Sequence, residues 1–386
     1  MDLNLPDDLK TLQAAVRRFV DLELMPLERT ARTRAGGLSE STLEGLRARA
    51  KELGLWQLDV PTEYGGQGLD FLTQCVVTEE VARTAALPFR YAGIFGPDVR
   101  PILFHCDDEQ KERFLFPLLR GDIRVCFAQT EPEAGSDPAG MRTRAVRDGD
   151  AYVLNGTKHY IGGADRAQYA QVMAVTDVGD GAPAGISCFI VDLRSPGVSV
   201  APHPAMLVDD RLSKIDFVDV RVPAADLIGK PGEGFGLAQE WITQGRIRGH
   251  GARCLGIASR ALEMMIAYSK ERVTFGQPLS ERQVIQFMVA DSAMELHAAR
   301  LMVYDCAWRY DRGEDVRDLS YMVKINATEM ASRVIDRAMQ VHGALGLSSD
   351  LPLEWWYRQL RSIRITEGAT EVLRWRLARN LMRRTG

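Results

Sequence analysis

Hydrophobic positions change their spacing twice along the 386-residue chain. In residues 1–122 they recur every three or four positions, which is the period of an amphipathic helix. In residues 123–231 the apolar runs are short, and turn residues separate them. The helical period returns in residues 232–386. The pattern therefore predicts an N-terminal α-helical domain, a middle β domain and a C-terminal helical domain with these bounds.

The two outer domains carry further helix signals. Ser41 and Glu44 have the spacing of a capping box, and Gly54 follows the apolar run as a stop signal. In the C-terminal domain, long helices are expected over residues 235–272, 281–311, 318–345 and 369–383. Their length suits a four-helix bundle, and their broad apolar surfaces suggest an oligomer that buries a second face.

The middle domain has the pattern of an all-β unit. Asp148-Gly149 lies between two strand-like runs, which is a hairpin signal. Further strands are expected over residues 125–129, 169–175, 186–191, 198–200 and 215–222. No helical pattern separates them, so we expect an antiparallel barrel or sandwich and not a doubly wound parallel sheet. The predicted fold class is α+β and multidomain, with an antiparallel β-barrel between two helical domains.

Composition narrows the class of protein. Apolar residues make up 46% of the chain. The chain contains no run of eighteen apolar residues, so no membrane span is predicted. The first residues are acidic and lack the apolar core of a signal peptide, so we expect a cytoplasmic protein. The net charge of −4 argues against nucleic-acid binding. The six cysteines form no C-x-x-C pair and the six histidines no ligand pair, so neither a metal site nor disulfides are expected.

Three loops allow more than one interpretation. The motif at 232–236 (GEGFG) lacks the spacing of a dinucleotide-binding loop, and we interpret it as a joint between two domains. The loop at 127–137 (FAQTEPEAGSD) can bind an anion or the polar edge of a flat ring, or it can be a surface turn. The segment at 272–279 can clamp a pyrophosphate through Arg272, or it can be a solvated connection between helices.

Glu367 stands directly before Gly368, at the start of a helical pattern. A carboxylate beside a glycine can face a substrate as a base, because no neighbouring Cβ lies in front of it. It can equally belong to an ordinary helix start, since acidic residues are favoured in the first turn. The pattern by itself leaves both roles open.

Five motifs occur along the chain, at 130–137 (TEPEAGSD), 155–161 (NGTKHYI), 272–276 (RVTFG), 340–343 (QVHG) and 367–368 (EG). Five motifs in one order are more specific than any one of them, and together they resemble the acyl-CoA dehydrogenase family over essentially the whole chain. The domain order of that family agrees with the hydrophobic pattern. The resemblance implies a tightly bound FAD between barrel and bundle, and an acyl-CoA substrate.

The resemblance assigns cofactor-binding roles to individual positions. The residues that match the surroundings of the flavin ring are Phe127, Gln129, Thr130, Tyr160, Ile161 and Gly162. The residues that match the pyrophosphate and adenosine side are Arg272, Thr274, Phe275, Gln283, Gln340 and Gly343. In the family this second group reaches the cofactor across a subunit boundary, which implies a homodimer or homotetramer.

Glu367 matches the catalytic base of the family. Ser136, Gly368 and Arg379 match positions on the substrate side of the site. An acyl thioester has a weakly acidic α C–H, so a base is needed to take that proton while the β-carbon gives a hydride to flavin N5. The electrons then pass to an electron-transfer flavoprotein.

The sequence departs from the family pattern near the expected site. Gly162 stands where many relatives have Thr or Ser, and Ala369 stands where Thr usually follows Glu-Gly. Thr366 replaces a bulky Tyr before the base, from which we expect a wider pocket and a branched or cyclic acyl group. The pattern can be aligned in two registers near residue 247, so it does not decide whether Arg246 or Arg248 approaches the site.

The predicted function is FAD-dependent dehydrogenation of an acyl-CoA to a 2,3-enoyl-CoA. One alternative is an acyl-CoA oxidase, which has the same fold but passes electrons to O₂. Another is a protein that holds the flavin for interaction without catalysis. The presence of Glu367 and the acidic net charge weigh against this last alternative.

Overall fold

The computed structural model describes residues 5–33, 37–87, 93–176, 185–204, 206–208 and 211–384. The chain divides into two compact units, one from Met1–Phe95 with Thr243–Gly386 and the other from Gly96–Ile242. The first unit thus combines both ends of the sequence, because helices from the two ends pack on one another. The predicted domain boundaries at residues 122 and 231 follow changes in secondary structure, and they stay a prediction.

The first unit begins with the helices α1 (Asp7–Phe19), α2 (Glu28–Thr33), α3 (Glu40–Glu52) and α4 (Phe71–Val81). The predicted cap of α3 at Ser41 is wrong by two positions. Ser39 is the N-cap, and its Oγ accepts a hydrogen bond from the Thr42 amide (3.2 Å). Gly54 follows α3 with φ +71°, which confirms it as the stop signal.

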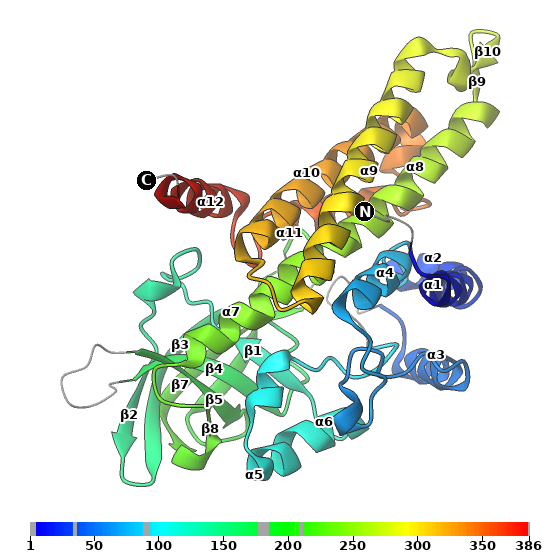
Figure 1. Cartoon of the computed structure of the whole chain (residues 1–386). Coiled ribbons are helices and arrows are strands. Elements are labelled where there is room, and N and C mark those ends of the chain that lie inside the picture. Colours follow the sequence, from blue (N-terminus) through cyan, green and yellow to red (C-terminus); the bar gives the residue numbers. More distant parts are fainter. Residues whose placement is uncertain are drawn as a thin grey trace. The chain divides into compact units, whose positions relative to one another are not determined.

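The C-terminal segment contributes most of the helices in this unit. They are the π-helix η8 (Gly245–Ala252), α8 (Arg253–Glu271), α9 (Gln283–Asp311), α10 (Arg317–His342), α11 (Leu353–Ile363) and α12 (Thr370–Arg384). Helices α8, α9 and α10 run side by side, and α11 and α12 pack against α10 (Figure 1). The hydrophobic pattern did not predict α11. A four-helix bundle as such stays a prediction.

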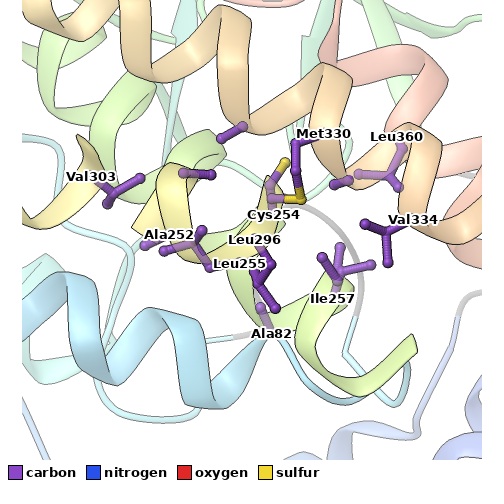
Figure 2. Close-up of a cluster of buried hydrophobic side chains, with 14 of the residues drawn as sticks. Ala82, Ala252, Cys254, Leu255, Ile257, Leu296, Val303, Met330, Val334 and Leu360 are labelled. Carbon is purple, nitrogen blue, oxygen red and sulfur yellow. The ribbon is translucent and has the colours of Figure 1, made fainter. Parts of the chain in front are cut away.

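Figure 2 shows part of the buried core between these helices. Its labelled side chains are Ala82, Ala252, Cys254, Leu255, Ile257, Leu296, Val303, Met330, Val334 and Leu360. Burying one large apolar side chain contributes about 1.5–3 kcal/mol, so this core fixes the position of η8 and α8 against α10 and α11. No helix in the described parts of the chain is both long and apolar enough to cross a membrane.

The second unit is built on a β-sheet. Its strands are β1 (Val125–Ala128), β2 (Arg144–Asp148), β3 (Ala151–Gly162), β4 (Tyr169–Thr176), β5 (Gly185–Asp192), β6 (Val198–Pro202), β7 (Leu212–Pro223) and β8 (Leu227–Ile228). The unit also contains the helices α5 (Asp108–Gln110) and α6 (Phe116–Arg120) and most of α7 (Gly234–Gln244). Apolar side chains from β1, β3, β4, β5 and β7 form its core.

The order of the strands corrects the predicted barrel. The sheet runs β6-β7-β3-β2-β4-β5-β8, with β1 paired to β4. The hairpin at Asp148-Gly149 is confirmed, because β2 and β3 pair antiparallel on either side of it. Within the described residues the end strands β6 and β8 do not pair with each other, so the sheet is not closed. Strand β4 also pairs parallel with β1 and β2. Strand order depends on contacts between distant segments, which side-chain alternation does not reveal.

The glycine motif at 232–236 packs on β5. The Gly232 amide donates to Ser187 Oγ (2.8 Å), and a Cβ at Gly234 would lie 2.5 Å from the Cys188 amide nitrogen. Glycine is therefore required by a close backbone approach. The preceding strand β8 pairs antiparallel with β5, so the motif does not lie in the parallel setting of a dinucleotide-binding loop.

Candidate active site

Glu367 lies in a tight turn between α11 and α12. The Thr370 amide donates to the Arg364 carbonyl (3.2 Å) and closes the turn. Glu367 has φ +55° and Gly368 has φ +101°. The left-handed region is costly for a residue with a side chain, so the surrounding contacts must hold Glu367 in this conformation.

The helix-start interpretation of Glu367 does not hold. Helix α12 begins three residues later, at Thr370, and Glu371 is the acidic residue of its first turn. The Glu367 carboxylate lies instead against the backbone of η8. A Cβ at Gly245 would be 2.9 Å from the carboxyl carbon, so a larger residue there would displace the carboxylate.

Two buried side chains of η8 contact this turn. Arg246 Nε donates to the Glu367 backbone carbonyl (2.9 Å), and its guanidinium lies 5.1 Å from the Tyr321 ring. Burial lowers the pKa of Arg246, although the charge of Glu367 opposes the shift. His250 lies with Nε2 2.9 Å from Thr366 Oγ1 and Nδ1 3.5 Å from Glu367 Oε2. The turn and the π-helix are thus joined at both the backbone and the carboxylate.

The geometry of η8 decides which arginine approaches the site. Arg246 contacts the Glu367 turn, whereas Arg248 pairs with Asp59 (2.9 Å) and Gln74 (2.7 Å). A π-turn holds one residue more than an α-turn, since its hydrogen bonds run from i to i+5. The family pattern left the choice between the two arginines open, and the contacts of η8 place Arg246 at the turn.

Lys324 of α10 holds the turn from the other side. Its ammonium donates to the carbonyls of Arg364 (2.9 Å) and Gly368 (2.8 Å), which flank Glu367 along the chain. Burial lowers the pKa of Lys324 to about 8, although the charge of Glu367 opposes the shift. One buried ammonium thus binds the first and the fifth residue of the six-residue turn 364–369.

In the second unit, the end of β1 leads into the predicted flavin loop. The Phe127 ring packs on Trp241 of α7, with ring centres 4.5 Å apart. The Thr130 carbonyl accepts a hydrogen bond from the His159 amide (2.8 Å), which joins the loop to β3. Gln129 Oε1 is buried and has no partner among the described residues. A buried acceptor of this kind suits a ligand that brings a donor, such as the polar edge of a flavin.

A buried ion pair supports that loop. Lys158 Nζ donates to Glu131 Oε1 (2.7 Å) and to the Gln129 carbonyl (3.0 Å). Burial lowers the pKa of Lys158 to about 8, against the effect of the Glu131 charge. Burial alone would raise the pKa of Glu131, but Lys158 and the amides of Arg142 and Thr143 together hold it below its usual value.

The remaining predicted residues of the second unit lie near the end of β3 or in the adjoining loop. Tyr160 has φ +59°, is half-exposed, and stacks on His203 with ring centres 4.4 Å apart. Ile161 is buried, and Gly162 pairs with β7. Ser136 is exposed in the loop after β1. The structure therefore connects the loop and β3 through the Thr130–His159 bond and presents an aromatic ring beside them.

The predicted pyrophosphate-side residues lie at the far end of α8 from η8. A small hairpin, β9 (Val273–Thr274) and β10 (Gln277–Pro278), joins α8 to α9. Arg272, Thr274 and Phe275 belong to this hairpin, and Phe275 is almost fully exposed. Gln283 is the first residue of α9. The segment is thus neither a long loop nor part of the turn that carries Glu367.

Three other predicted residues lie on α10 and α12. Gln340 is in the last turn of α10, and Gly343 ends that helix with φ +61°. His342 stacks on Tyr268 of α8, so this end of α10 lies beside the hairpin end of α8. Arg379 is exposed on α12, with its guanidinium 5.4 Å from the Trp375 ring. Its assignment to the substrate side stays a prediction.

Sequence reasoning did not single out Gly245, His250 or Lys324 as site residues. Each reaches the turn from a helix more than forty positions away in the chain, and no local spacing signals such a contact. It also missed Glu131 and Lys158, although both lie inside the matched motifs. The motifs contain these two opposite charges, but they do not show that both are buried and paired with each other.

Comparison with known proteins agrees with this architecture. Three family models match the chain: the acyl-CoA dehydrogenase N-terminal domain over residues 6–122, the middle domain over 126–220 and the C-terminal domain over 232–382. The chain is 34% identical to (R)-benzylsuccinyl-CoA dehydrogenase of Thauera aromatica over 396 residues, covering 99% of this chain and 97% of that protein.

Two further relatives show the range of named activities. Acryloyl-CoA reductase (NADH) of Anaerotignum propionicum is 35% identical over 389 residues, covering 100% of this chain and 97% of that protein. The solved structure of butyryl-CoA dehydrogenase from Megasphaera elsdenii is similar with a TM-score of 0.87 at 31% identity, covering 99% of this chain and all of that one. With all three family domains matched in order, the chain belongs to the acyl-CoA dehydrogenase family and is an FAD-dependent oxidoreductase that acts on a CH–CH bond of an acyl-CoA.

Proposed function

We propose that this enzyme dehydrogenates an acyl-CoA to a 2,3-enoyl-CoA, with Glu367 as the base that takes the α-proton. The observation that supports this most is the position of Glu367: its side chain is 19% exposed, and its carboxylate rests on Gly245 from a left-handed turn. A carboxylate fixed in this way needs little reorganisation before it accepts a proton. General-base catalysis of this kind usually contributes about 10²–10⁴ in rate.

The residues around Glu367 have separate tasks in this proposal. Arg246 and Lys324 bind backbone carbonyls of the turn, so they fix the position of the Glu367 backbone from which its side chain extends. Gly245 leaves room for the carboxylate itself. Bound FAD supplies the acceptor for the hydride that leaves the β-carbon of the substrate. The chain then holds the abstracted proton on Glu367 until the product leaves.

We assign the flavin ring to the loop after β1 and the end of β3. Gln129 Oε1 offers a buried acceptor, and Thr130 adds a hydroxyl beside it. Phe127 and Ile161 supply apolar surface, and the exposed ring of Tyr160 can cover a flat cofactor. Gly162 has no hydroxyl, so only its backbone can serve where relatives use a side chain. Ser136 remains our candidate for contact with the CoA part of the substrate.

The second group of predicted FAD residues supports a proposed oligomer. Helix α8 has 19 residues, so it separates Arg272 from η8 by about 28 Å. We therefore assign Arg272, Thr274, Phe275 and Gln283 to the flavin of a second copy. Exposed apolar residues also recur every seven positions along α9, which is the spacing of a helix that packs on another helix. They are Phe287, Met294, Leu301 and Trp308. A homodimer or homotetramer would cover them.

The substrate and the electron acceptor are further parts of the proposal. The small Thr366 before the base leaves space for a branched or cyclic acyl group. We assign an electron-transfer flavoprotein as the acceptor. One relative is named a dehydrogenase and another, at similar identity, a reductase. The reaction direction that we propose for this enzyme is dehydrogenation.

Anaerobic mixing with a panel of acyl-CoAs tests the proposal directly. We expect at least one branched or cyclic acyl-CoA to bleach the visible flavin band, and Glu367→Gln to slow that bleaching by at least a hundredfold. Bleaching by Glu367→Gln at the wild-type rate would show that another group is the base. Reoxidation of the reduced enzyme by O₂ faster than by an electron-transfer flavoprotein would identify an oxidase instead. A flavin that no acyl-CoA bleaches would favour a non-catalytic role.

A further inference from the structure

We infer that His250 is a positioning residue for Glu367: its Nδ1–H holds the carboxylate, and the Thr366 hydroxyl holds the imidazole. This inference rests on the proposed role of Glu367 as the base. It adds a residue that neither the sequence motifs nor the family resemblance singled out. It also gives Thr366, which departs from the usual bulky residue before the base, a task of its own.

The contacts define an ordered chain of three groups. His250 is 4% exposed and belongs to the π-helix η8. Its Nε2 lies 2.9 Å from Thr366 Oγ1, which is an ordinary hydrogen-bond distance. Its Nδ1 lies 3.5 Å from Glu367 Oε2, which is long for such a bond. Catalytic hydrogen bonds are often long without substrate and shorten in the complex.

The same geometry selects one tautomer of His250. With the proton on Nδ1, the ring donates toward the carboxylate, and Nε2 accepts from the Thr366 hydroxyl. With the proton on Nε2, the lone pair of Nδ1 would face Glu367 Oε2 in a buried site. Two acceptors facing each other away from water are unfavourable. The carboxylate thus selects the Nδ1–H tautomer, and the Thr366 hydroxyl, which can donate or accept, matches it by donating its proton to Nε2.

The other charged groups near the turn act on its backbone or at longer range. Arg246 Nε binds the Glu367 carbonyl, and Lys324 binds the carbonyls on either side of that residue. Tyr321 of α10 faces the Arg246 guanidinium, and Glu371 of α12 lies within range of the Lys324 charge. His250 differs from these groups because it faces the carboxylate itself.

A matched pair of variants isolates the proposed donor. Asparagine carries an N–H close to the place of Nδ1, whereas leucine has nearly the same shape and no donor. The readout is deuterium exchange from ²H₂O into the α-carbon of 3,3-dimethylbutanoyl-CoA, followed by mass spectrometry. This thioester has no β-hydrogen, so exchange reports proton abstraction without hydride transfer. We expect His250→Leu to slow exchange about tenfold to a hundredfold, and His250→Asn to stay within about threefold of wild type.

The pH profile of exchange separates this role from a merely structural one. A donor to the carboxylate favours its ionised form, so losing the donor moves the acid limb of the profile to higher pH, by about one unit in His250→Leu. His250→Asn should leave the limb in place. Equal exchange rates in the two variants, or an unmoved acid limb in His250→Leu, would overturn the inference.

Two controls keep the result interpretable. Glu367→Gln should abolish exchange; if it exchanges like wild type, the base assignment fails, whatever the His250 variants do. If His250→Leu does not fold, Thr366→Val and Thr366→Ser form a second matched pair. We expect the valine variant to slow exchange several-fold and to move the acid limb, and the serine variant to keep both near wild type. A valine variant that matches the serine variant would contradict the proposed chain of contacts.

Discussion

Two turns of this enzyme are held by a buried lysine, and they differ in what the lysine binds. In the second unit, Lys158 binds the Gln129 carbonyl and pairs with the buried carboxylate of Glu131. In the first unit, Lys324 binds two carbonyls of the Glu367 turn and has no carboxylate at hydrogen-bond distance among the described residues. Burial lowers the pKa of each lysine to about 8.

The difference indicates what each turn is built to do. The charge of Lys158, on β3, is neutralised by Glu131 of the loop that it supports, so the ion pair is closed within the second unit. The charge of Lys324 is only partly balanced, by Glu367 across the turn. A carboxylate that must change its protonation state during the reaction cannot be locked in a close ion pair. We interpret the carbonyl clamp as a way to fix the backbone of Glu367 while leaving its side chain able to react.

The largest effect is expected from Lys158→Met. Removing one partner of a buried ion pair leaves Glu131 as an uncompensated buried charge, which costs about 3–5 kcal/mol. We expect the free energy of unfolding in urea to fall by that amount. The double variant Lys158→Met/Glu131→Leu should recover much of the loss, since both charges are then removed. A Lys158→Met protein as stable as wild type would show that the loop does not depend on the pair.

A smaller effect is expected from Lys324→Met. The change leaves the carbonyls of Arg364 and Gly368 buried without their donor, at a cost of about 2–3 kcal/mol. We also expect kcat to fall at least tenfold, because the turn that carries the base loses its clamp. Urea unfolding and steady-state kinetics measure the two effects. The exposed Lys270→Met serves as the control, and equal behaviour of the two variants would refute the clamp.

The pH dependence of the free energy of unfolding should reveal the lowered pKa of Lys324 in the same experiment. Its pKa is about 8 in the folded protein and about 10.5 when exposed, so the unfolded chain binds more protons between these values. Stability from this group therefore rises as pH increases through that window. We expect the free energy of unfolding of wild type minus Lys324→Met to grow by about 2 kcal/mol from pH 8 to pH 10. A difference that is flat or falls with pH would contradict the lowered pKa.

The smallest effect is expected from Gln129→Leu in the loop that Lys158 supports. The change removes a buried acceptor that has no partner among the described residues, so stability without FAD should change little. If that acceptor meets the flavin, FAD should bind about fivefold to tenfold more weakly, which corresponds to about 1 kcal/mol. Titration of the deflavinated protein with FAD gives the dissociation constant. Unchanged FAD affinity would remove Gln129 from the cofactor site.

Local patterns in the sequence determined much of the secondary structure. The periods of 3.6 and 2 separated helical from β segments, and Asp148-Gly149 marked its hairpin correctly. These features depend on neighbouring residues, whose spacing the chain itself fixes. Glu367 also stood out from the sequence, through its glycine neighbour and the family motifs.

Only the tertiary structure decided how distant segments meet. It showed an open sheet in place of the expected barrel. The parallel pairing of β4 with β1 and β2 could not be predicted, because pairing is not a property of any single strand. It selected Arg246 over Arg248, because Arg246 binds the Glu367 carbonyl whereas Arg248 pairs with Asp59. It brought two distant residues to the turn that carries Glu367: Lys324 binds Gly368, 44 positions away, and His250 contacts Thr366, 116 positions away. Such contacts depend on how buried helices pack, and no repeating pattern along the chain encodes them.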